Sequence, residues 1–218
     1  YFFVPQKGRN FVLFVMSILF YAWGEPVYVL LMLAQIVISY VLLWFVDRFR
    51  GRRAAGIFYI LSVLLPFAAL FYFKYFEFFM ETLFGIQTKT IALPIGISFY
   101  TFQIASYCVD VYRGRVERQK NIVTYAAYVT LFPQLVAGPI VRYSEIEQTL
   151  TRGADLSKIR GNIGNGLVRF AVGLGKKVLI ANVAGEFVSE IAMLGQRDLP
   201  LSWAYAVAVS LQIYFDFS

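Results

Sequence analysis

The sequence contains no histidine and only one cysteine, Cys108. Without imidazole, these 218 residues have no His-based acid–base catalysis and none of the usual zinc sites. One cysteine excludes an internal disulfide framework, and its position in the middle of an apolar run says nothing about the redox compartment. We therefore expect no metal centre and no bound cofactor within the chain.

Charged residues are also scarce, at 15% of the chain against 59% apolar residues, and the mean hydropathy is +0.64. Several apolar runs are too long for the core of a soluble domain. Aromatic residues make up 18% of the chain, which fits a lipid-facing surface with Tyr and Trp near its interfaces. The composition predicts an all-α, multi-pass membrane protein whose first partner is the lipid bilayer.

The net charge of +7 is concentrated in short loops beside apolar runs, at residues 7–9, 47–53 and 113–120. Basic short loops mark the cytoplasmic side of a membrane protein. They are not interleaved with exposed aromatics in a polar domain, so no nucleic-acid partner is expected. Two crossings are expected between each of these loops and the next. An even number of crossings returns the chain to the same side, so all three loops are expected on the cytoplasmic side.

Three apolar runs open the chain, at residues 11–23, 27–46 and 54–73. The Gly24-Glu25-Pro26 sequence predicts a tight turn between the first two. Pro66 predicts a kink in the third. Mixed charges and dense aromatics at 74–90 favour an interfacial helix and loop over another crossing.

Residues 93–112 form the fourth expected crossing, and they carry polar groups on one face. Gly96, Tyr100, Gln103, Tyr107 and Asp110 follow one another at steps of four and three, which places them on one helical stripe. Such groups are costly facing lipid. The stripe is therefore expected to face other helices, either as a hydrogen-bonded seam or as the lining of a wet passage. For Asp110, an ion pair with a nearby arginine of the 113–115 loop is the structural alternative.

Residues 122–141 are apolar but contain Pro133 and the pair Gly138-Pro139. Each proline removes a backbone donor, and broken helix at membrane depth requires protein or water to satisfy the freed groups. We favour a re-entrant segment that returns to the basic side over a kinked simple span. Amphipathic residues at 142–160 and a glycine-rich helical stretch at 162–187 follow, and an apolar run from Leu201 reaches Ser218.

Two of these stretches resemble a known family. LPIGISFYTFQIASYCVDVYRG at 93–114 and LFPQLVAGPIVRY at 131–143 are similar to motifs of the membrane-bound O-acyltransferases. FYAWGEP at 20–26 and IYFDFS at 213–218 fit the same branch, which is that of the bacterial alginate O-acetylation membrane subunit. The teichoic-acid D-alanyl transferases share much of this pattern.

The resemblance implies a ring of tilted transmembrane helices around a central passage, with re-entrant and interfacial helices at the cytoplasmic face of a bacterial inner membrane. It implies transfer of an acyl group, such as acetyl from cytoplasmic acetyl-CoA as co-substrate, to an outer polysaccharide such as alginate, with partner acetylation proteins. The family's catalytic histidine lies in its C-terminal half, so none is expected before Ser218. The framework or passage residues that carry over are Tyr100, Gln103, Asp110, Gln134, Gly138, Pro139, Arg142 and Asp216.

The chain is accordingly expected to be one N-terminal piece, residues 1–218, of a single transmembrane domain, cut at both ends and inactive alone. D-alanyl transfer to teichoic acid is the alternative within the family. A transporter or flippase is the alternative outside it, because broken helices and intramembrane polar stripes are also transporter features. A transporter is expected to show matched broken helices in two halves, and only one is visible here.

Overall fold

The computed structural model describes residues 4–86, 92–135, 140–152, 156–194 and 198–218. Over these ranges the regular structure is helical, with no strand. The chain divides into two compact units, Tyr1–Gly153 and Ala154–Ser218, and each is described by itself. The predicted all-α fold is confirmed for the described residues, while the prediction of one domain over residues 1–218 stays a prediction.

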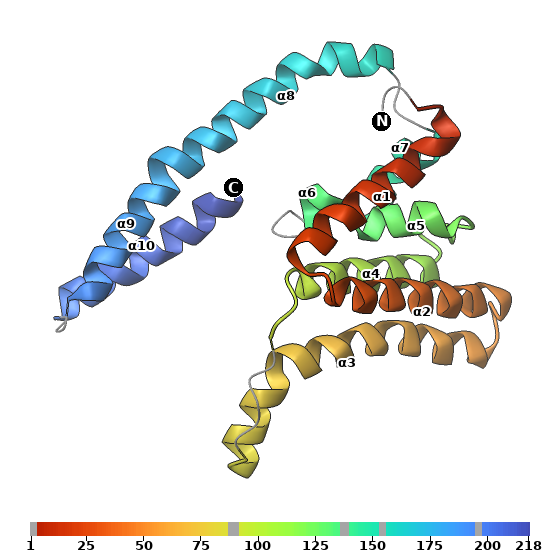
Figure 1. The fold of residues 1–218 in the computed structure, drawn as a ribbon, viewed down its shortest axis with the longest axis horizontal. Coiled ribbons are helices and arrows are strands. Elements are labelled where there is room, and N and C mark those ends of the chain that lie inside the picture. Colours follow the sequence, from red (N-terminus) through yellow and green to blue (C-terminus); the bar gives the residue numbers. More distant parts are fainter. Residues whose placement is uncertain (1–3, 87–91, 136–139, 153–155, 195–197) are drawn as a thin grey trace. The chain divides into compact units, whose positions relative to one another are not determined.

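The described residues of the first unit form seven helices (Figure 1): α1 (Gln6–Gly24), α2 (Tyr28–Arg48), α3 (Arg53–Phe84), α4 (Ile97–Tyr112), α5 (Ile122–Val129), α6 (Phe132–Leu135) and α7 (Tyr143–Arg152). Helices α2, α3 and α4 pack on one another, and α5 packs on α1. The predicted turn at residues 24–26 is present, because α1 ends at Gly24 and α2 begins at Tyr28.

Two of the described helices, α2 and α3, are long and apolar enough to cross a membrane, and Gly8–Gly24 of α1 forms a shorter apolar helix. Only 33% of the apolar window of α2 and 22% of that of α3 is buried. A core helix of a soluble protein hides most of its apolar surface. These helices leave theirs facing outward, as lipid-contacting helices do.

Helix α3 is longer than the sequence pattern predicted. An interfacial helix and loop were expected after residue 73, and the structure joins that helix to the preceding span, because α3 continues to Phe84 and stops only at Gly85, whose φ of 64° is left-handed. Charges at Lys74, Glu77 and Glu81 do not break a helix, whereas glycine readily supplies a left-handed end. Figure 1 shows that α3 bends in its second half, whereas the predicted kink residue Pro66 lies in its first half.

A contact from α4 compensates for Pro66. Proline has no N–H, so the carbonyl four residues earlier, that of Ser62, loses its intrahelical donor. The Cys108 thiol lies 3.8 Å from this carbonyl oxygen and acts as a weak donor. The lone cysteine is fully buried and packs α4 against the proline turn of α3.

The fourth predicted crossing is shorter than expected. Helix α4 begins at Ile97, after Gly96 with a φ of 75°, and its 16 residues span about 24 Å. That length is below the roughly 30 Å of a hydrocarbon core. Gly96 therefore caps the helix instead of lying on its stripe.

The two central basic loops meet at one end of the first unit. Arg118 Nε lies 3.6 Å from Asp47 Oδ2, and Arg50 donates to the Val111 carbonyl at 3.1 Å. At the opposite end, the hydroxyls of Tyr21 and Tyr28 donate to the carbonyls of Ile95 and Ala92. The predicted grouping of loops 47–53 and 113–120 at one end is confirmed.

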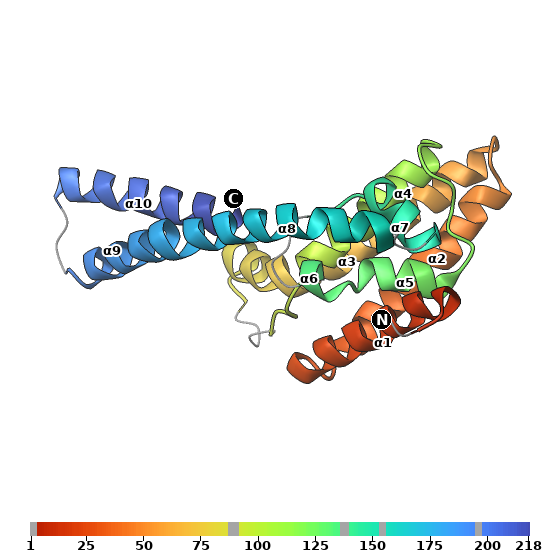
Figure 2. The same cartoon turned by 90° about the horizontal axis from the view of Figure 1, so that it is seen from above.

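The second unit contains α8 (Leu156–Lys176), the π-helical turn η1 (Lys177–Ala181), α9 (Asn182–Met193) and α10 (Leu199–Phe217). Helix α10 doubles back along α9 and η1, as Figure 2 shows. A Cβ at Gly185 would lie 2.9 Å from Gln212 Nε2, so α9 and α10 approach closely at this glycine, and a larger residue there would require the Gln212 side chain to move.

Candidate functional site

The polar stripe of α4 lies in the interior of the first unit. Tyr100, Gln103 and Tyr107 are at most 2% exposed, and Asp110 is 6% exposed. The neighbouring apolar positions Ile97, Ile104 and Val111 are buried as well, so helices surround α4 on more than one side. The expectation that the stripe faces other helices is confirmed.

Gln103 forms the central polar contact of this interior. Its Nε2 donates to the Tyr128 carbonyl at 2.9 Å and to Gln134 Oε1 at 3.2 Å. The Tyr128 carbonyl is available because α5 ends at Val129, and the last carbonyls of a helix lack intrahelical donors. Two residues predicted from separate motifs, Gln103 and Gln134, are thus brought into direct contact.

A second side chain accepts a hydrogen bond from the backbone N–H that the break in the helix leaves without its usual partner. In a continuous helix the Phe132 N–H would bond to the Tyr128 carbonyl. Here the Phe132 N–H points to Ser17 Oγ of α1 at 3.4 Å. Gln103 and Ser17 together replace the hydrogen bond that the break between α5 and α6 removes, as irregular backbone in an apolar interior requires.

Close approach of α6 to α4 depends on Gly96. A Cβ at this position would lie 2.4 Å from the Leu135 carbonyl oxygen, closer than van der Waals contact permits. Leu135 is fully buried, so this backbone cannot shift into solvent. The glycine lets the Gln134-bearing turn reach the face of α4.

The broken segment doubles back to the end at which it began. Gln119, just before α5, donates through Nε2 to the Tyr143 hydroxyl at the start of α7, at 2.8 Å. The Tyr128 hydroxyl donates to the Val141 carbonyl at 3.1 Å. Both limbs therefore lie beside the basic loop that contains Gln119, as the re-entrant interpretation predicted. A single kinked crossing would have carried Tyr143 to the opposite end.

Four buried tyrosines fill the space between these limbs: Tyr107, Tyr125, Tyr128 and Tyr143. Tyr107 and Tyr143 have ring centroids 4.8 Å apart, and Tyr128 and Tyr143 are 5.2 Å apart. The Tyr107 hydroxyl accepts from the Gln119 N–H at 2.7 Å. Burial raises the pKa of Tyr143 above its ordinary value, although the Gln119 bond acts in the opposite direction, so this hydroxyl stays protonated at neutral pH.

A hollow of about 940 Å³ lies beside the start of α5. Carboxamides and hydroxyls supply much of its polar lining, with Asn10, Gln119, Asn121 and Thr124 among them. Asn121 Oδ1 caps α5 by accepting from two backbone N–H groups, and Asn10 Nδ2 donates to Thr124 Oγ1 and to the Leu150 carbonyl. Most of these groups form hydrogen bonds with one another or with the backbone of α5 and α7, so the lining holds α1, α5 and α7 together.

Asp110 forms an ion pair with Arg115, whose Nη1 lies 3.7 Å from Asp110 Oδ1. This is one of the two arginine pairings that the sequence left open. The Arg115 N–H also bonds to the Asp110 carbonyl at 2.9 Å, so the loop folds back over the end of α4.

The other predicted residues lie apart from the Gln103–Gln134 contact. Tyr100 is fully buried, and its hydroxyl has no hydrogen-bond partner among the described residues. Arg142 is exposed beside the start of α7, while Gly138 and Pro139 fall outside the described residues. Asp216 belongs to the second unit, where its carboxylate pairs with Lys177 of η1.

Three residues of this network were not among the predicted site residues: Ser17, Gln119 and Tyr143. Their roles depend on contacts between segments far apart in the chain, up to 115 residues for Ser17 and Phe132. The Tyr125 and Tyr128 spacing on α5 was a readable signal, because residues three apart share a helix face. No group of His, Cys, Asp or Glu that could hold a metal ion occurs in the part of the chain that the structure describes.

Comparison with known proteins was made over the full chain. It is 35% identical to the probable alginate O-acetylase AlgI of Pseudomonas aeruginosa and 35% identical to that of Azotobacter vinelandii, in both cases over 100% of its length. It is 30% identical over 93% of its length to the peptidoglycan O-acetyltransferase of Helicobacter pylori. The chain covers 43%, 45% and 44% of these three relatives, respectively.

No protein-family model and no solved structure matches the chain. The similarity to named relatives extends beyond the motifs that first indicated it, since it covers the whole of the chain in the AlgI comparisons. The sequence-based recognition is thereby confirmed: the chain is similar over its full length to probable alginate O-acetylases and over 93% of its length to a peptidoglycan O-acetyltransferase.

Proposed function

We propose that the whole protein is a membrane-bound O-acyltransferase that transfers acetyl groups to a cell-surface polysaccharide, most simply alginate. The observation that carries this proposal is the 35% identity to a probable alginate O-acetylase over the full chain. The outward-facing apolar helices α2 and α3 support a multi-pass position in a bacterial cytoplasmic membrane.

In this proposal the first unit supplies the cytoplasmic half of the framework. The loops at 47–53 and 113–120 form its basic end, which matches the cytoplasmic side of membrane proteins. The re-entrant segment begins and ends there and reaches inward as far as the Gln103–Gln134 contact. The acyl donor, acetyl-CoA, approaches from this side as a co-substrate, and exposed Arg142 attracts its negative charge.

The catalytic base is proposed to lie in the part of the relatives' length that this chain does not span. Acyl transfer to a hydroxyl needs a base with a pKa near the working pH, and imidazole meets this need best. The chain has no histidine, its one thiol is fully buried, and Asp110 is paired with Arg115. Residues 1–218 alone are therefore proposed to be inactive.

Expression of the full-length protein in a strain that lacks its own alginate O-acetylase tests this function. Acetyl ester on the secreted alginate is expected with the full-length protein and absent with residues 1–218 alone. Replacement of each histidine beyond Ser218 by alanine is expected to identify one position at which ester formation stops. Ester formed by a full-length protein without those histidines would refute the assignment of the base.

The Helicobacter pylori relative supports a second acceptor, peptidoglycan. The same strains can be assayed for O-acetyl groups on purified peptidoglycan. Acetylation of peptidoglycan without acetylation of alginate would keep the reaction class and change the acceptor. Partner acetylation proteins that pass the acyl group to the acceptor are part of the proposal. Their need is tested by repeating the assay in host strains from which other proteins required for alginate acetylation have been deleted.

A further inference from the structure

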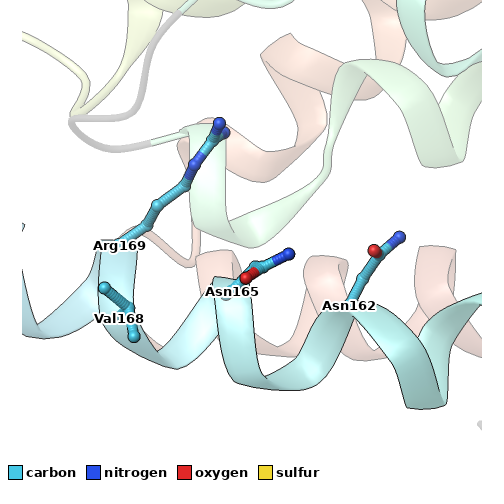
Figure 3. Close-up of a pocket in the computed structure, with 5 residues that line it drawn as sticks. Asn162, Asn165, Val168 and Arg169 are labelled. Carbon is cyan, nitrogen blue, oxygen red and sulfur yellow. The ribbon is translucent and has the colours of Figure 1, made fainter.

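Helix α8 carries a polar stripe that the proposed function does not use. Asn162, Asn165 and Arg169 follow one another at steps of three and four, which places them on one face of the helix. They line a pocket together with Gly166 and Val168. Figure 3 shows the side chains of Asn162, Asn165 and Arg169 projecting toward the same side of α8.

The stripe is positively charged and contains no counter-charge of its own. The sequence of α8 has four basic residues and no aspartate or glutamate. The ion pairs of the described residues do not include Arg169, and this residue is exposed. Lys176, two turns further on, donates to the Ser218 hydroxyl at 2.9 Å, which is a neutral partner. Arg169 therefore presents a guanidinium that has no anionic partner among the described residues.

The opposite face of α8 is apolar and equally uncovered within its own unit. Ile163, Leu167, Phe170 and Leu174 recur at steps of four, three and four, and they are 50–68% exposed. A helix with a basic polar stripe on one side and large apolar residues on the other fits the plane of a membrane interface. There the apolar side enters the hydrocarbon and the polar side meets the headgroups.

We propose that α8 lies in the membrane interface and that Asn162, Asn165 and Arg169 bind the phosphate of an anionic phospholipid headgroup. A guanidinium forms paired hydrogen bonds with phosphate oxygens, and the two carboxamides add N–H donors on the same face. The lipid matches both sides of the helix, since its acyl chains lie beside the apolar face while its phosphate lies at the stripe. A soluble phosphate compound would leave the apolar face uncovered.

The test uses the full-length protein in a neutral detergent, titrated with phosphatidylglycerol, with bound lipid counted by native mass spectrometry. Arg169→Gln removes the charge and is expected to weaken the apparent affinity about tenfold, the loss of a charge-assisted hydrogen bond. Arg169→Lys keeps the charge and is expected to retain most of the affinity. Arg113→Gln removes a charge from an exposed loop elsewhere and is expected to change the affinity by less than about twofold.

Inorganic phosphate, titrated in parallel, separates a lipid site from a general anion site. Wild-type protein is expected to bind phosphatidylglycerol, and excess inorganic phosphate is expected to displace little of it. Equal affinity of wild type and Arg169→Gln for phosphatidylglycerol, with both proteins monodisperse, would overturn the proposal. Strong binding of inorganic phosphate that depends on Arg169 would overturn it as well. If Arg169→Gln aggregates, Asn165→Leu is tested in its place, with the same weakening expected.

Discussion

Gly96 is the residue at which a single added carbon has the clearest structural consequence. It has a left-handed φ of 75°, and its Cβ position is occupied by the Leu135 carbonyl. Gly85 has a similar φ of 64°, but nothing lies within 4 Å of its Cβ position. A comparison of substitutions at the two glycines therefore separates the cost of a left-handed backbone from the cost of a steric clash.

Gly96→Ala is expected to destabilise the full-length protein more than Gly85→Ala. The positive φ alone costs about 1 kcal/mol in each variant, and the clash with Leu135 adds about 1–3 kcal/mol at Gly96. The midpoint of thermal unfolding in detergent measures both. Equal midpoints would show that α6 does not approach α4 at Gly96.

Gln103 is the residue that satisfies the broken backbone, so its loss leaves the Tyr128 carbonyl buried without a donor. Gln103→Leu is expected to cost about 1–3 kcal/mol of stability. Gln148 on α7 is exposed, and Gln148→Leu is the matched control, with an expected change within about 0.5 kcal/mol. Thermal midpoints measure stability, and acetyl ester in the strain assay measures function.

The comparison of these two readouts separates the two interpretations of the stripe. If Gln103 is a structural seam, the loss of ester in Gln103→Leu should follow the loss of folded protein in the membrane. If it lines a passage, ester should fall while the amount of folded protein stays near normal. Full activity at normal abundance would exclude both roles.

At the scale of elements, the re-entrant path depends on Gln119, which holds the start of α5 beside the start of α7. Its side chain bonds to the Tyr143 hydroxyl, and its backbone bonds to the Tyr107 hydroxyl of α4. Three helices therefore meet at one loop residue. This geometry fixes the two limbs of the segment more firmly than apolar packing alone, which has no direction.

A double-mutant cycle tests this junction. Gln119→Leu and Tyr143→Phe are each expected to destabilise the protein by about 1 kcal/mol, and the double variant by less than the sum. Tyr112, whose ring stacks on Tyr59, is the control, because Tyr112→Phe should add to Gln119→Leu without coupling. Additive losses for Gln119 and Tyr143 would contradict the observed hydrogen bond.

At the scale of the whole molecule, the grouping of the two basic loops at one end predicts that both face the cytoplasm. Arg52 and Lys120 are exposed in the two basic loops, and Ile86 is exposed just after α3. Cysteines at Arg52 and Lys120, in a Cys108→Ala background, should react with membrane-impermeant thiol reagents only after permeabilisation. A cysteine at Ile86 should react in intact cells. Labelling of both loop positions in intact cells would reverse the topology.

The sequence predicted the interior stripe and the re-entrant segment because both are local patterns. A period of 3.6 residues places Gln103 and Asp110 on one face, and each proline removes a backbone donor from the helix that contains it. The continuity of α3 with the helix expected after residue 73 was missed for the opposite reason. A cluster of charges resembles an interfacial break, yet helix ends depend on backbone conformation, which Gly85 supplies eleven residues later.

The sequence by itself determined that this protein is helical and apolar, and that its basic loops gather at one end, since charge and hydropathy act residue by residue. Only the tertiary structure decided which groups satisfy the backbone that the break exposes. Gln103 and Ser17 come from helices far from it in the chain, and no periodicity relates positions 115 residues apart. Their partnership follows from packing, because a buried carbonyl or N–H must find a donor or acceptor wherever the fold brings one near.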